Sequence, residues 1–235
     1  MIDLSKKPEI FHEKRTITYD RDHWAMLKNL RQRASDVLRH LKEAGLEGYV
    51  YGSVARGDTS KTSDIDIVLL GIVPSYRLEL VLGKGVKREL VQATPSSVLK
   101  GHLHLNLETV VSFPLFKMMS REREFYQWGG MIGLQDLNSG IRIPGVDKRL
   151  VLIEPTKTGH TEQSVLDCES YVAKMLGVSS SIAQERVRVL MRRDIVGRTG
   201  VYRIHDLTDD ETFETAAKKL TDSDPALRRT LRRRD

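Results

Sequence analysis

The sequence predicts a mixed α/β domain followed by a smaller helical module at the carboxyl end. From about Asp22, apolar residues recur at three- and four-residue intervals on one stripe, and Gly45 supplies a stop, which indicates a long helix. Short strands follow at residues 49–51 and 64–70, with a glycine turn and a short helix between them. This order of elements is typical of a sheet with one covered face.

Composition limits the class of protein. The chain has 235 residues, 30% of them charged, and its mean hydropathy is −0.36, so we expect a soluble protein. It has no apolar run of ~18 residues and no apolar leader at its start, which favours the cytoplasm and no membrane partner. The single Cys168 cannot form an internal disulfide. The net charge of +6 favours anionic partners such as nucleotides or nucleic acid.

Two carboxylates and a glycine turn form the most informative segment. Asp64 and Asp66 are two residues apart on the strand predicted at 64–70, so both side chains project to the same side of the sheet. Such a like-charged pair is costly unless a cation relieves it, and Mg²⁺ typically takes one or two protein carboxylates. Upstream, backbone amides at Gly52 and Ser53 lead into a helix and suit phosphate groups.

The segment Gly-Ser-x-Ala-Arg-Gly at residues 52–57, followed by Ser-Asp-Ile-Asp at 63–66, resembles the signature of the DNA polymerase beta superfamily of nucleotidyltransferases. The minimal archaeal and bacterial members are the most similar. The resemblance covers roughly residues 22–130 and implies an α/β (α+β) nucleotidyltransferase palm with a mixed sheet. It also implies transfer of a nucleoside monophosphate from an NTP, such as ATP, to a hydroxyl acceptor with release of pyrophosphate, the EC 2.7.7 type of reaction.

The resemblance also implies roles for individual residues. Two Mg²⁺ ions, with Mn²⁺ as an alternative, would be held by Asp64, Asp66 and a third carboxylate, and would clamp the attacking and leaving oxygens. The expected nucleotide-binding residues are Gly52, Ser53, Arg56 and Ser63, with Arg56 facing the departing pyrophosphate.

The third carboxylate has two candidates, Glu89 and Glu108. Glu89 lies in a short extended run over residues 87–93, and we prefer it because it resembles the family's strand of an acid plus small apolar residues, leading into a helix predicted at 96–100. The family usually has Asp at this position. Glu108 ends a run of alternating leucines and shares one strand face with His104.

The rest of the first domain, predicted to span residues 1–158, carries weaker signals. Residues 113–130 are expected to form an aromatic, charge-rich helix that covers the palm, and its basic residues Lys117, Arg121 and Arg123 are alternative phosphate contacts. A hairpin is expected around residues 144–147. Residues 154–160 are expected to form a linker in which His160 is structural or solvated.

Residues 159–235 resemble a winged helix-turn-helix domain with a basic tail. Two amphipathic segments flank Gly177, and residues 193–204 resemble the hairpin wing. The candidate nucleic-acid contacts, for base edges and phosphate, are Ser181, Gln184, Arg188 and Arg198. Winged helices also bind proteins, so RNA, DNA and a protein all remain candidate partners. The tail after residue 206 is predicted to form a helix that ends in a basic run.

Two classes of function therefore compete. The first is a Mg²⁺-dependent nucleotidyltransferase that modifies a nucleic acid or a protein. The second is a DNA-binding regulator whose palm senses a nucleotide without catalysis. The intact Asp64, Asp66, Gly52 and Ser53 favour the first, because a sensor need not keep a metal-binding pair.

Overall fold

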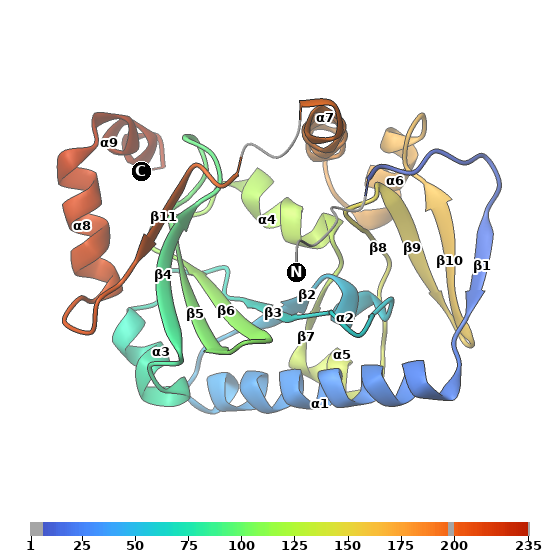
Figure 1. Ribbon diagram of the computed structural model, residues 1–235, viewed down its shortest axis with the longest axis horizontal. Helices are drawn as coiled ribbons and strands as arrows, with labels where there is room; N and C mark the ends of the chain where they lie inside the picture. Colours follow the sequence, from blue (N-terminus) through green and yellow to red (C-terminus); the bar gives the residue numbers. More distant parts are fainter. Residues whose placement is uncertain (1–6, 197–199, 235) are drawn as a thin grey trace.

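The computed structural model describes residues 7–196 and 200–234 (Figure 1). Its strands in chain order are β1 (Arg15–Thr18), β2 (Tyr49–Tyr51), β3 (Ile65–Val68), β4 (Lys87–Gln92), β5 (Lys100–Asn106), β6 (Thr109–Pro114), β7 (Met131–Gly133), β8 (Gly145–Val146), β9 (Val151–Thr156), β10 (Gly159–Ser164) and β11 (Arg203–Asp206). Its helices are α1 (Arg21–Glu43), α2 (Ser53–Arg56), α3 (Ser75–Leu82), α4 (Ser120–Trp128), α5 (Leu134–Asn138), α6 (Glu169–Leu176), α7 (Ser180–Val196), α8 (Phe213–Ser223) and α9 (Pro225–Arg232). None of the helices in these ranges combines the length and apolar content needed to cross a bilayer.

A seven-stranded sheet forms the palm, in the order β11-β4-β5-β6-β3-β2-β7. Strands β3 and β6 are parallel, and the other neighbours are antiparallel, so the predicted mixed sheet is confirmed. The predicted long helix is α1, which begins after the capping residue Asp20 and is followed by Gly45 in the left-handed region.

One face of this sheet is the main core. Helix α1 lies along it (Figure 1), and α3 and α8 pack beside it. Leu38 of α1 packs with Ile65 and Ile67 of β3 and with Leu103 of β5, and each is at most 2% exposed. The alternation in β3 therefore directs its isoleucines into this core and Asp66 to the opposite face.

The opposite face is covered only in part by α4. Tyr126 of α4 makes an edge-on contact with Tyr51 of β2 and packs against Val68 of β3. Residues 113–117, predicted to be helical, are instead the end of β6 and the start of a loop, and the helix begins at Ser120. The helix predicted at 96–100 is also wrong, because these residues turn directly into β5.

A four-stranded sheet, in the order β1-β10-β9-β8, stands beside the palm. Residues 154–160, predicted to be a linker, are the hairpin that joins β9 to β10, with Gly159 paired to Thr156. The domain boundary predicted between residues 158 and 159 therefore falls inside a hairpin. Helices α6 and α7 pack against this sheet through a second core that includes Leu152 and Val172.

The segment predicted to form a wing has a different structure. Residues 193–196 continue α7, residues 197–199 lie outside the described residues, and β11 pairs with β4 of the palm, with Ile204 opposite Val91. The described part of this segment therefore forms no hairpin. The physical reason is that β4 would otherwise be a sheet edge, and β11 satisfies its backbone groups.

The last two helices return to the palm. Phe213 of α8 is fully buried and makes an edge-on contact with Phe113 of β6, with 4.9 Å between ring centroids. In the predicted basic tail, Arg234 is 5% exposed and pairs with Glu122 of α4 at 2.6 Å. The other tail arginines, at positions 228, 229, 232 and 233, are exposed.

This packing predicts that α8 stabilises the whole palm. Phe213→Ala should lower the free energy of unfolding by about 3–5 kcal/mol, because it removes a buried aromatic ring and leaves a cavity. Chemical denaturation followed by circular dichroism measures this change. The matched control is Leu107→Ala, at a side chain that is 96% exposed, which should change stability by less than about 0.5 kcal/mol. Equal stability of the Phe213→Ala variant and the wild type would contradict this packing.

Candidate active site

The two predicted aspartates lie where β3 begins, on the face of the sheet opposite α1. Asp66 is the cross-strand partner of Tyr51, the last residue of β2, so the turn that follows β2 lies beside the start of β3. Asp64 is exposed and Asp66 is half-buried. Burial raises the pKa of Asp66, and the nearby charge of Asp64 raises it further. The two aspartates are two residues apart in the chain, an arrangement that suits one shared cation.

The glycine turn joins β2 to α2. Gly52 has a φ of 80° and a ψ of −145°, a conformation that is essentially restricted to glycine, and its amide donates to the carbonyl of Gly130 at 2.9 Å. The next residue, Ser53, donates from its hydroxyl to that of Ser63 at 3.3 Å. Since Ser63 precedes Asp64, this contact connects the glycine turn to the carboxylates. Five of the predicted site residues therefore lie together: Gly52, Ser53, Ser63, Asp64 and Asp66.

Two lysines near the carboxylates have no counterpart in the sequence motif. The positive charges of Lys148, in the turn between β8 and β9, and of Lys100, at the start of β5, oppose the rise in the pKa of Asp66. Lys100 also donates to the hydroxyl of Tyr126 at 3.0 Å. The only sequence signal for Lys100 is its alternation with the polar residues of β5, and Lys148 has no signal at all. Both cations suit a polyphosphate beside the aspartates.

Arg56 does not occupy the position predicted for it. Its side chain is 6% exposed and forms a two-point ion pair with Asp58, at 3.0 and 2.9 Å. It also donates to the carbonyl of Gly129 at 2.5 Å, next to the carbonyl that accepts from Gly52. Nε, Nη1 and Nη2 of the guanidinium therefore each donate a hydrogen bond within the protein, and the buried side chain does not extend into solvent toward a leaving pyrophosphate. It instead holds the loop on which the glycine turn rests.

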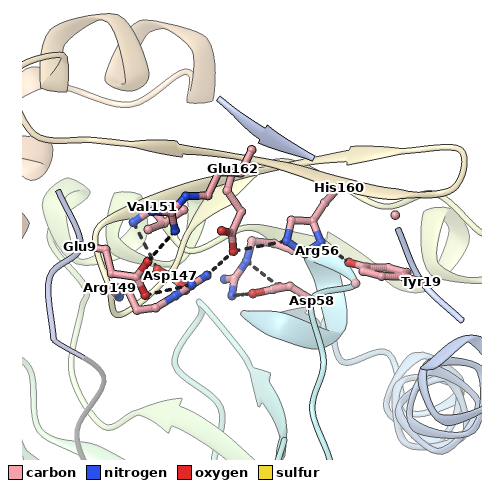
Figure 2. Close-up of polar contacts among 12 residues, drawn as sticks. Glu9, Tyr19, Arg56, Asp58, Asp147, Arg149, Val151, His160 and Glu162 are labelled. Carbon is pink, nitrogen blue, oxygen red and sulfur yellow. Dashed lines mark hydrogen bonds and ion pairs between the residues drawn. The ribbon is translucent and has the colours of Figure 1, made fainter. Parts of the chain in front are cut away.

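A polar network lies beside this ion pair. Figure 2 shows the Arg56–Asp58 pair next to His160 and Glu162 of β10. The hydroxyl of Tyr19 and Nδ1 of His160 are 2.6 Å apart, and both residues are buried. His160, predicted to be structural or solvated, is thus structural. The network links Tyr19 to β10 of the smaller sheet, beside the Arg56–Asp58 pair.

Glu89 is not close to Asp66. Strands β6 and β5 lie between β3 and β4, and three strand spacings amount to about 14 Å. The imidazole of His102, with Lys87 and His104, holds the pKa of Glu89 well below its usual range. The prediction that Glu89 binds the same metal as Asp66 is therefore wrong, because the β5–β6 hairpin inserts between the two strands.

The alternative third carboxylate, Glu108, is also directed elsewhere. It lies in the turn between β5 and β6 and pairs at 2.7 Å with Arg33 of α1, the helix on the opposite face of the sheet. On β6, the strand next to β3, the positions paired with Asp66 and Val68 are Val110 and Ser112. Among the described residues, the strand beside the aspartates therefore supplies no acid on their face.

Three of the predicted nucleic-acid contacts lie on α7. Ser181, Gln184 and Arg188 are exposed and follow one another on one face of the helix. Arg198 lies outside the described residues. On its other side α7 packs against α4, where Arg186 covers the ring of Phe125 at 4.9 Å.

The chain was compared with known protein families. Residues 31–117 match the family model of the nucleotidyltransferase domain. The matched segment runs from α1 through β6 and contains the glycine turn, Asp64 and Asp66. No curated protein and no solved structure matches the chain. The match supports a nucleotidyltransferase of the polymerase beta type and leaves the helices and strands after β6 unassigned.

The glycine turn gives a first test of the site. Gly52→Ala should lower the free energy of unfolding by about 1–3 kcal/mol, because an L side chain is strained at this φ although no atom lies within 4 Å of the added Cβ. Gly71→Ala is the matched control, since its added Cβ also meets nothing and its φ is not positive. Equal effects of the two substitutions in urea denaturation would contradict the strain argument.

The structural role of Arg56 gives a second test. Arg56→Met should destabilise the chain by about 3–5 kcal/mol, because Asp58 is left as an uncompensated buried charge. The double variant Arg56→Met/Asp58→Asn should recover at least about 1 kcal/mol of that loss. Denaturant midpoints of the wild type, both single variants and the double variant measure the coupling. A double variant less stable than Arg56→Met would contradict it.

Proposed function

We propose that this chain is a Mg²⁺-dependent nucleotidyltransferase that transfers a nucleoside monophosphate from an NTP to a hydroxyl group. One observation carries the proposal: Asp64 and Asp66 lie beside the Gly52–Ser53 turn, inside the segment that matches the nucleotidyltransferase domain. The partly buried, mutually repelling carboxylates suit a divalent cation, and the turn beside them suits phosphate.

The donor set fits Mg²⁺. Two carboxylate oxygens at the start of β3 are typical of a Mg²⁺ ion that keeps waters and substrate phosphates as its other ligands. When bound, the ion would supply charge neutralisation at the reacting phosphate and its attacking and leaving oxygens. A second ion on the acceptor side would lack the third carboxylate of the superfamily, since β6 offers Val110 and Ser112 at the matching positions.

The chain's own residues would then hold the NTP. Gly52 has no side chain, so its backbone allows close approach of the phosphates, and Ser53 offers a hydroxyl donor. Lys100 and Lys148 would neutralise the polyphosphate and take the role that the motif assigned to Arg56. The acceptor hydroxyl would belong to a nucleic acid or a protein, and the exposed stripe of α7 that carries Arg188 is the candidate acceptor contact.

A second function is favoured by the absence of an acid at positions 110 and 112 of β6. A palm with two carboxylates can bind Mg²⁺–NTP without deprotonating an acceptor. The chain would then be a nucleotide-sensing regulator that binds nucleic acid through α7. Such a protein would bind NTP and transfer nothing.

Transfer of label from each α-phosphate-labelled NTP in Mg²⁺ tests the proposal, with RNA, DNA and co-purifying proteins as acceptors. Asp66→Asn should lower transfer by on the order of a hundredfold or more, because one of the two metal carboxylates is lost. Its free energy of unfolding should stay within about 1 kcal/mol of the wild type or exceed it, since burial disfavours the charged form of Asp66.

The matched control is Asp36→Asn, at an aspartate of α1 whose side chain is 44% exposed and pairs with Arg39. This variant should transfer label as the wild type does. Full activity of Asp66→Asn would overturn the proposal. Mg²⁺-dependent NTP binding without transfer to any acceptor would select the regulator instead.

A further inference from the structure

A second cluster of metal-ligating side chains lies on the same face of the palm sheet. His102 and His104 are two residues apart on β5, so both project to one face, and Glu89 of β4 is the cross-strand partner of His102. Three ligand atoms, one from each side chain, lie within 4.8 Å of one another. The side chains are 10% exposed for Glu89, 22% for His102 and 23% for His104, so the cluster is accessible to a small ion.

The distances suit a small tetrahedral ion. Oε1 of Glu89 is 2.9 Å from Nε2 of His104 and 3.7 Å from Nδ1 of His102. Two ligand atoms of a tetrahedral zinc ion are about 3.3 Å apart, given bonds of about 2.0–2.1 Å. Small side-chain rotations would therefore place all three atoms around one ion and leave a fourth position open to water.

A carboxylate and two neutral imidazoles are the forms that bind a metal, so zinc binding would release the proton that Nε2 of His104 shares with Oε1 of Glu89 at 2.9 Å. Lys87 contacts the other carboxylate oxygen, Oε2, at 2.5 Å, and it also pairs with Asp206 of β11 at 3.0 Å. Lys87 thus holds Oε2 of Glu89 while Oε1 faces the two imidazoles. Groups around a metal site commonly orient its ligands by such contacts.

We propose that Glu89, His102 and His104 bind a zinc ion. Two imidazoles and one carboxylate are the ligand set of zinc sites with one open position, whereas Mg²⁺ prefers oxygen ligands alone. Strand β6 separates β5 from β3, so this site lies about 10 Å from Asp66, and it does not depend on nucleotidyl transfer. A zinc ion would connect β4 to β5 and add a positive charge to the face that carries the aspartates.

Metal analysis of the untagged full-length chain tests the site. After dialysis against micromolar zinc, the wild type should retain one zinc ion per chain and melt at a higher temperature than the metal-free protein. His104→Gln and Glu89→Gln should each weaken zinc binding by at least about tenfold and remove the rise in melting temperature. Circular dichroism checks that each variant is folded, and His102→Gln provides a third variant if one of them is not.

Two controls separate this site from the rest of the chain. His40→Gln removes an exposed histidine of α1 and should leave zinc binding unchanged. The Asp64→Asn/Asp66→Asn variant should also keep its zinc, whatever happens to nucleotidyl transfer. A wild type that retains no stoichiometric zinc, or zinc binding that survives His102→Gln, His104→Gln and Glu89→Gln alike, would overturn the proposal. In that case the cluster is an ordinary ion pair between strands.

Discussion

The antiparallel pairing of β2 with β3 is the constraint on which the candidate active site depends. It places Tyr51 opposite Asp66, so the chain leaves β2 and enters the Gly52–Ser53 turn next to the strand that carries the carboxylates. Ile65 and Ile67 bury the other side of β3 against α1, which fixes the register. A shift by one residue would move Asp66 into the apolar core. The positions of the turn and the carboxylates are therefore set by the hydrophobic core beneath them.

The surroundings of the glycine turn show how a motif residue can act through packing. Gly52 donates to the loop at Gly130, and Arg56 holds that loop through the adjacent carbonyl of Gly129. Arg56 is neutralised by Asp58, and the polar network of Tyr19 and His160 lies beside them (Figure 2). The smaller sheet also contacts α2 through β9, although it lies outside the segment that matches the family model.

The local parts of this architecture could be predicted from the sequence because they depend on neighbours in the chain. The stripe of α1, the glycine turn and the alternation around Asp66 follow from local periodicity and backbone geometry.

The position of Glu89 could not be predicted, because strand order is decided by long-range pairing, and the β5–β6 hairpin separates Glu89 from β3. The prediction of a wing was wrong for the same reason. The local pattern of residues 193–204 does not reveal that β11 pairs with the edge of β4. Lys148 lies in the turn between β8 and β9, far along the chain from Asp66, and carries no local signal.

The proposed function requires Asp64 and Asp66 to hold a divalent ion bound to the phosphates of an NTP. A crystal structure with a non-hydrolysable NTP and Mn²⁺, located by its anomalous scattering, measures this directly. We expect an Mn²⁺ ion coordinated by both aspartates, with the triphosphate against Gly52 and Ser53 and near Lys100 and Lys148. A triphosphate bound elsewhere, or metal that is absent from the aspartates while the nucleotide is present, would contradict it.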